Sequence, residues 1–268
     1  MTALAMPTWL VGCGNMAGAL LDGWRAAGID LSGAVVIRPS SKPVEGIATV
    51  SSIAMAGSSP AAVILGFKPQ QLDAVAVELA PHLALQTVVI SLLAGVEAAS
   101  LRARLPTAGA IVRAMPNLPV AVRRGVVALY SEDGNATLRD QLSHLFGALG
   151  FAAWVKSEAE LTAIGSIAGA GPAYAARFIA ALAKAGVARG LDPKLAATVA
   201  LETVLGTGWM AAASGEAMDE VARRVASPNG TTEAGLDVLD RALDDLIGVT
   251  IEAAARRGAE LAADARVP

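Results

Sequence analysis

The segment Thr8–Trp24 reads "TWLVGCGNMAGALLDGW" and joins a short apolar run to a glycine turn and then to residues with helical spacing. Gly12, Gly14 and Ala17 follow the pattern G-x-G-x-x-A, a variant of the dinucleotide-binding fingerprint. The first glycine permits the tight turn, the second lets the backbone approach a pyrophosphate, and the alanine lets helix and strand pack closely. Amides at the start of a helix also attract phosphate. The segment therefore predicts a nucleotide site formed by Gly12, Cys13, Gly14, Asn15, Met16 and Ala17.

The first half of the chain repeats this alternation of short apolar runs and helical segments. The runs are rich in Val and Ile and read "TWLVG", "AVVIR", "AAVILGF", "TVVISLLAG", "AIVRAM", "VVALY" and "AAWV". Segments with helical spacing lie between most of them, at 16–27, 70–80 and 136–149. Such alternation is typical of a parallel sheet that is covered on both faces. We therefore predict an α/β fold that begins with a Rossmann-type dinucleotide-binding domain over residues 1–157.

The strand patterns stop at about Lys156–Glu158, where we place the domain boundary. Beyond it we predict an all-α domain over residues 158–268, with helices at 171–189, 193–214, 218–225 and from 231 toward the C-terminus. Pro172 and Pro193 stand in first turns, where a helix tolerates proline. Helices so rich in Ala and Gly can approach one another closely, also between two copies of the chain.

Composition restricts the class of protein. The 268 residues carry a net charge of −3, which argues against nucleic-acid binding by bulk charge. A single cysteine, Cys13, excludes an intrachain disulfide and suits a reducing cytoplasm. The most apolar helical stretch, 171–191, is interrupted by Arg177, Lys184 and Arg189, and no basic region precedes the apolar N-terminal residues. We therefore expect a cytoplasmic protein without signal peptide or membrane span, whose apolar faces are buried between subunits.

The second apolar run indicates which dinucleotide binds. It continues as "AVVIRPSSKP", which supplies two cations and two hydroxyls and no carboxylate before Glu45. An NAD site usually places an acidic residue here for the ribose 2′-hydroxyl, whereas arginine accommodates a 2′-phosphate. We therefore predict NADPH/NADP as the cofactor, with NADH less favoured, and assign to it Arg38, Ser40 and Ser41.

Three later strands end in turn residues at the edge where open α/β sheets bind ligands. The residues that we assign to the cofactor there are Gly66, Phe67, Lys68 and Pro69 in "ILGFKPQQL", Ala94 and Gly95 in "LLAGV", and Asn117 in "RAMPNLPV". The two histidines, His82 and His144, fall on predicted helix or loop surface. No metal site is predicted.

Six motifs, in order along the chain, point to one family. They read "GCGNMA", "GFKPQ", "MPNLP", "AGAGPAY", "VLGTGWM" and "SPNGTTEAGL". In these motifs the chain resembles pyrroline-5-carboxylate reductase, the last enzyme of proline biosynthesis, over nearly its whole length. The resemblance implies hydride transfer from NADPH to the C=N carbon of a cyclic imine, pyrroline-5-carboxylate, which gives proline. It also implies a homodimer formed by the helical domain, or a larger homo-oligomer of such dimers.

The resemblance assigns roles to particular residues. The substrate carboxylate would be bound by Ser227, Gly230, Thr231 and Thr232, which agrees with the free amides expected at a helix start. Thr232 is the candidate catalytic residue, because its hydroxyl could form a hydrogen bond with the ring nitrogen of the substrate. Glu158 corresponds to an acidic family position that meets the nicotinamide end, and Lys68 and Asn117 would line the cofactor side.

The chain departs from the family pattern at four of these motif positions. Ala168 and Ala170 replace two serines, so backbone groups must take over any hydrogen bond that those hydroxyls make. Trp209 replaces a lysine. Asn229 replaces a glycine, and we expect the turn to survive because asparagine adapts to left-handed backbone better than most residues.

Two other functions fit parts of the sequence. One is a reductase of another cyclic imine or of a 3-hydroxy acid. The latter would want a catalytic lysine in the second domain, and Lys184 and Lys194 lack the expected glycine-rich and asparagine surroundings. The other is a non-catalytic NADP sensor that signals through its helical domain. A sensor would not need an anion-binding loop at 227–232.

Overall fold

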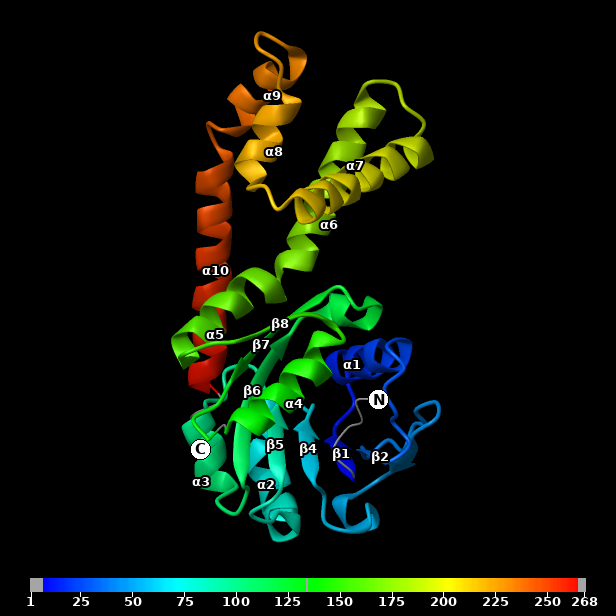
Figure 1. The fold of residues 1–268 in the computed structure, drawn as a ribbon, viewed down its shortest axis with the longest axis vertical. Helices are drawn as coiled ribbons and strands as arrows, with labels where there is room; N and C mark the ends of the chain where they lie inside the picture. The colour runs from blue at the N-terminus through cyan, green and yellow to red at the C-terminus, as the bar shows by residue number, and fades with distance from the viewer. Residues whose placement is uncertain (1–6, 134, 265–268) are drawn as a thin grey trace. The chain divides into compact units, whose positions relative to one another are not determined.

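An eight-stranded sheet in the order β3-β2-β1-β4-β5-β6-β7-β8 forms the first half of the chain (Figure 1). The computed structural model describes residues 7–133 and 135–264. The strands are β1 Thr8–Val11, β2 Ala34–Ile37, β3 Ala48–Val50, β4 Ala62–Leu65, β5 Val88–Ser91, β6 Ala110–Pro116, β7 Gly125–Tyr130 and β8 Gly150–Trp154. Neighbours are parallel except β6 and β7. The strand order reverses between β1 and β4, which is where sheets of this kind bind ligands.

Helices cover both faces of the sheet, as the alternating pattern predicts. The helices of this half are α1 Asn15–Ala26, α2 Leu72–Leu79, α3 Ala98–Arg104, α4 Ala136–Gly147 and α5 Glu158–Ile164, with short 3-10 turns at Ile53–Met55, Pro69–Gln71, Ala80–His82 and Leu118–Val122 (η4). Side chains alternate along a strand, so Leu10 of β1 enters a core with α1 and α4 while Trp9 and Val11 enter a second core with α2 and α3.

The second half of the chain is helical. It contains a π-helical turn at Gly165–Gly169 and the helices α6 Gly171–Ala188, α7 Pro193–Ser214, α8 Met218–Val225, α9 Thr231–Leu239 and α10 Leu243–Asp264. The last predicted helix is thus two helices, with a break between Leu239 and Leu243. By its contacts the chain divides into one compact unit that runs to Ala170 and resumes at Ala254, and a second unit over Gly171–Ala253.

Helix α7 has the length and apolar content of a membrane-crossing helix, which the sequence reading did not single out. Length and composition are its sole resemblance to a membrane span. Within the described chain 11% of its most apolar window is buried. Most of its apolar residues are therefore uncovered in the single chain.

Helix α1 approaches η4 so closely that one glycine on it has no room for a side chain. A Cβ on Gly23 would lie 2.1 Å from the carbonyl oxygen of Val120 and 2.7 Å from Leu149 Cδ2. Gly18, on the same helix, has open space around its Cα. We therefore expect Gly23→Ala to lower the free energy of unfolding by about 1–3 kcal/mol through overpacking.

Gly18→Ala is the matched control for this prediction. It should raise stability by up to about 1 kcal/mol, because alanine favours the helix. Thermal unfolding of the two variants measures both effects. Equal melting temperatures for them would contradict the close α1–η4 contact.

Candidate functional site

The turns after β1 and β4 meet backbone to backbone. Gly12 has a φ of +81°, and a Cβ on it would lie 2.8 Å from the Phe67 nitrogen. A Cβ on Gly66 would in turn lie 2.9 Å from the Gly12 oxygen and 3.0 Å from Ala17 Cβ. Glycine is therefore required at both positions. Gly14 caps α1 in extended backbone, so the amides at the helix start face outward as a phosphate site requires.

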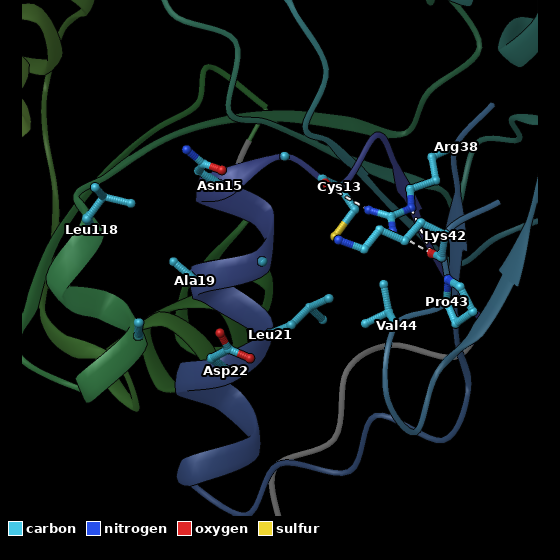
Figure 2. Close-up of a pocket in the computed structure, with 13 residues that line it drawn as sticks. Cys13, Asn15, Ala19, Leu21, Asp22, Arg38, Lys42, Pro43, Val44 and Leu118 are labelled. Carbon is cyan, nitrogen blue, oxygen red and sulfur yellow. Dashed lines mark hydrogen bonds between the residues drawn. The ribbon is translucent and has the colours of Figure 1, made fainter. Parts of the chain in front are cut away.

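Arg38, at the end of β2, links this glycine turn to the loop that follows it (Figure 2). Its Nη1 donates to the Cys13 carbonyl at 3.1 Å, and its Nε donates to the Lys42 carbonyl at 2.9 Å, an oxygen to which Nη2 also donates. The loop makes a tight bend, with Ser41 at a φ of 48°. The guanidinium therefore holds the two loops in register and keeps further N–H groups for another acceptor.

A cleft of about 920 Å³ opens beside α1, between the Arg38–Lys42 loop and η4 (Figure 2). The cleft is lined by four of the residues that we assigned to the cofactor, namely Cys13, Gly14, Asn15 and Arg38. The sequence analysis did not assign the rest of its lining, which is Gly18, Ala19, Leu21, Asp22, Lys42, Pro43, Val44, Leu118 and Ala121. Lys42, Pro43 and Leu118 belong to stretches that the sequence analysis used for other residues, and the remaining positions have no motif of their own.

Cys13 is half-buried in this cleft. Burial raises the pKa of its thiol above the ordinary value, and the positive charge of Arg38 acts in the opposite direction. The thiol is therefore protonated at neutral pH.

The remaining assigned turns lie at the same edge of the sheet, since β1, β4, β5 and β6 run parallel. Lys68 is exposed, and its backbone N–H donates to Gln71 Oε1 at 3.2 Å ahead of Pro69. Gly95 has a φ of +75° in the turn after β5, beside exposed Ala94. The edge thus offers a row of turns along which an extended ligand can lie.

Two residues assigned to the cofactor have polar partners inside the domain. Asn117 is 6% exposed. Its Oδ1 accepts the Val126 N–H at 2.8 Å, and its Nδ2 donates to the Ala168 carbonyl at 3.0 Å. Glu158 forms an ion pair with Arg113 through Oε2, and its Oε1 accepts the Ala98 N–H at 2.8 Å. Contact of either side chain with a cofactor stays a prediction.

Arg113 is a buried cation on β6 that the sequence analysis did not assign. Burial lowers its pKa to about 10, and the negative charge of Glu97 opposes this shift. The side chain is therefore protonated at neutral pH and is held against Glu158. A single arginine in an apolar strand, "AIVRAM", is the one sequence signal that could have indicated it.

The loop before α9 forms a tight turn that ends in a helix start. The Gly230 N–H donates to the Ser227 carbonyl at 2.9 Å, and Asn229 has a φ of 56°, so its predicted left-handed backbone is confirmed. A Cβ on Gly230 would lie 2.8 Å from the Ser227 oxygen, so glycine is required there. Thr231 and Thr232 are exposed in the first turn of α9. Their amides have no acceptor within the helix.

Glu233 adds a carboxylate to this turn that the sequence analysis did not assign. Its Oε2 accepts the Asn229 N–H at 2.6 Å. In a capping box the third helical residue accepts the N-cap N–H, whereas here Glu233 accepts the N–H of the residue before the N-cap, Gly230. The bond holds the turn in shape and leaves the amides of Thr231 and Thr232 to an external anion.

Comparisons with known proteins match both halves of the chain. Residues 158–261 match the family described as pyrroline-5-carboxylate reductase dimerisation, and residues 9–95 match the one described as NADP oxidoreductase, coenzyme F420-dependent. Pyrroline-5-carboxylate reductase of Pseudomonas aeruginosa is 37% identical, over 94% of this chain and 95% of that protein. The enzyme of Pisum sativum is 33% identical, over 94% of each.

Solved structures give the same picture. The NADP-bound pyrroline carboxylate reductase of Plasmodium falciparum superposes with a TM-score of 0.86 at 26% identity, covering 96% of this chain and 98% of that chain. The pyrroline-5-carboxylate reductase of Coxiella burnetii also has a TM-score of 0.86, at 30% identity, covering 96% of this chain and 99% of that chain.

Proposed function

The chain belongs to the pyrroline-5-carboxylate reductase family, and on that basis we propose how its residues share the reduction of 1-pyrroline-5-carboxylate to L-proline by NADPH. The observation that carries the proposal is that the full-length similarity coincides with two helix starts, at Gly12–Asn15 and Gly230–Thr231, and that Gly12 and Gly230 in these turns have no room for a side chain. One start suits a pyrophosphate and the other a carboxylate.

The cofactor lies along the carboxyl edge of the parallel strands. Gly12–Ala17 hold the pyrophosphate, and the turns Gly66–Pro69 and Ala94–Gly95 support the rest of the dinucleotide. The Arg38 guanidinium, which also donates to the Cys13 and Lys42 carbonyls, donates to the 2′-phosphate. Ser40 and Ser41 lie in the same loop and contribute to this site. When bound, NADPH supplies the hydride, and the protein supplies orientation and electrostatics.

The substrate binds through the loop Ser227–Thr232. The amides of Thr231 and Thr232 hold its carboxylate, and the Thr232 hydroxyl forms a hydrogen bond with the ring nitrogen. No strong general acid is required, because an imine can enter from water already protonated. Thr232 therefore orients the C=N bond rather than supplying the proton.

The helical unit needs a second copy of the chain. Among the residues described in Gly171–Ala253, three are buried, namely Ala196, Ala200 and Val221. Large apolar side chains stand exposed along α6 and α7, among them Phe178, Leu182, Leu195, Val199, Leu201 and Leu205. Exposed apolar area of this extent marks an interaction surface. We assign it to a homodimer or a higher homo-oligomer, in which the apolar face of α7 is covered by protein rather than lipid, and we place the enzyme in the cytoplasm.

The cofactor assignment predicts a selective effect at Arg38. Arg38→Asp should weaken NADPH by about ten- to a hundredfold, because a charge-assisted hydrogen bond is lost and a like charge faces the 2′-phosphate. NADH should weaken a few-fold, since the same change also releases the Cys13 and Lys42 carbonyls. Kinetics with both cofactors measure the ratio, and Arg38→Lys, which keeps the charge, should keep most of the preference for NADPH. Equal losses for the two cofactors would place the 2′-phosphate elsewhere.

The substrate assignment predicts a graded series at Thr232. Thr232→Ala and the equally shaped Thr232→Val should both lower turnover by about ten- to a hundredfold, because one hydrogen bond to a charged group is worth about 1.5–3 kcal/mol. Thr232→Ser should keep much of the activity, and NADPH affinity should change little in all three. NADPH oxidation should be fast with pyrroline-5-carboxylate and slow with 1-pyrroline, which lacks the carboxylate. A fully active Thr232→Val variant would show that the hydroxyl has no role in turnover. Equal rates with the two imines would show that the loop Ser227–Thr232 does not bind the carboxylate.

The assembly assignment predicts different effects of one substitution in the two units. Leu201→Glu, on α7, should reduce the molar mass in light scattering toward that of one chain, because it places a charge in the apolar face. Val77→Glu, at a position of α2 that is 77% exposed, is the matched control and should leave the mass unchanged. A wild-type chain with the mass of a monomer would refute the dimer.

A further inference from the structure

Strand β6 presents alternate residues to a single segment, Glu158–Ala168. Residues two apart on a strand point to the same face, and Arg113, Met115 and Asn117 follow this spacing. Arg113 pairs with Glu158 at the start of α5. Met115 packs in the cluster of Val155, Leu161 and Ala128, and Asn117 donates to the Ala168 carbonyl. The strand therefore holds both ends of the segment and its middle.

The pair of Arg113 and Glu158 fixes the first end. The Arg113 side chain is 6% exposed and that of Glu158 is 28% exposed, so the cation is the more deeply buried partner. The second carboxylate oxygen accepts the Ala98 N–H, which follows the Ala94–Gly95 turn by a few residues. Removing one partner of a buried pair leaves the other charge uncompensated. The pair thus couples β6, the turn after β5 and the start of α5.

The bonds of Asn117 fix the second end. Its Oδ1 accepts from Val126 on β7 while its Nδ2 holds the Ala168 carbonyl, so the amide bridges the sheet and the π-helical turn Gly165–Gly169. A Cβ on Gly165 would lie 3.3 Å from Met115 Cε, so this turn rests closely on β6. Turns of this type are rare and are frequent at functional sites.

The held turn lies where the far end of the cofactor is expected. Strand β6 runs parallel to β5, so Asn117 follows β6 at the same edge as the turns at Gly12, Gly66 and Gly95. The strand order along this edge is β1, β4, β5 and β6. A dinucleotide with its pyrophosphate at β1 therefore extends its nicotinamide half past β4 and β5 toward β6.

We propose that Arg113 and Asn117 are positioning residues that hold Glu158–Ala168 so that the turn 165–169 forms a wall for the nicotinamide. This inference rests on the proposed placement of the cofactor. It assigns to Asn117 and Glu158 the task of shaping the site from behind, through Ala168 and Arg113, in place of direct contact with the cofactor. Loss of the hold should affect hydride transfer more than cofactor affinity, because a displaced wall misorients a ring that is still bound.

Asn117→Asp tests the proposal at the second end. It keeps the acceptor for Val126 and loses the donor to Ala168. In the cofactor-free protein, hydrogen exchange of the amides at 165–171 should rise about three- to tenfold. The kcat should fall about ten- to a hundredfold, while KM for NADPH stays within about twofold. Asn135→Asp is the matched control, because Asn135 likewise accepts an N–H through Oδ1, from Leu138, and lies away from this segment. It should change neither readout.

Arg113 provides the second variant, should Asn117→Asp fold poorly. Arg113→Met should lower kcat as Asn117→Asp does, and Arg113→Lys, which keeps a cation against Glu158, should restore most of it. Arg104→Met removes a more exposed arginine–carboxylate pair, with Asp73, from α3 and should leave kcat unchanged.

Three results would overturn the proposal. The first is a folded Asn117→Asp protein with wild-type kcat. The second is an equal loss in Asn135→Asp or Arg104→Met. The third is a loss confined to NADPH affinity with unchanged exchange, which would make Asn117 a direct ligand. A wild-type chain inactive on pyrroline-5-carboxylate would instead refute the proposed function, and the exchange experiment does not depend on that activity.

Discussion

The contact between the backbones of Gly12 and Gly66 is the constraint on which the rest of the site depends. A side chain at either position would overlap the other turn, by the distances that a Cβ would have. The two turns follow β1 and β4, the strands between which the sheet order reverses. Because no side chain projects from either glycine, a ligand can approach the main chain at that edge of the sheet, next to the start of α1. Arg38 then fastens the neighbouring loop to the same turn through the Cys13 carbonyl.

Much of this could be predicted from the sequence, because local patterns specify it. The alternation of apolar runs and helical segments predicted the α/β fold, and the glycine spacing predicted the turn after β1. Strand β3 was not predicted, because three residues, Ala48–Val50, are too few to show a period. The roles of Arg113 and Asn117 within the fold were not predicted either, since they depend on partners 45 and 51 residues away. Partners so distant are fixed by strand order, which no local pattern records.

For the helical unit, a single sequence predicts the helices but not what covers their apolar faces. Its helices were predicted from composition and proline positions, yet in the single chain they bury very little: Ala196, Ala200 and Val221 among the described residues. A helix gains most of its stability in proteins from packing one face. In the proposed homo-oligomer the stability of this unit is therefore linked to association, and the loop proposed for the substrate, at the start of α9, depends on it in the same way.

The chain binds its two proposed anions by different means, and the difference follows from their charge. A 2′-phosphate carries close to two negative charges, and the site proposed for it has the cation Arg38, with Lys42 also lining the cleft. The substrate carboxylate carries one, and its loop offers amides and hydroxyls together with the carboxylate of Glu233. That carboxylate is engaged by the Asn229 N–H, so it shapes the turn while adding negative charge near the site. Binding there must come from directed hydrogen bonds at a helix start rather than from net charge. The proposed substrate site would therefore select for the geometry of a planar carboxylate, and its own negative charge would disfavour the more highly charged phosphate that is assigned to the first site.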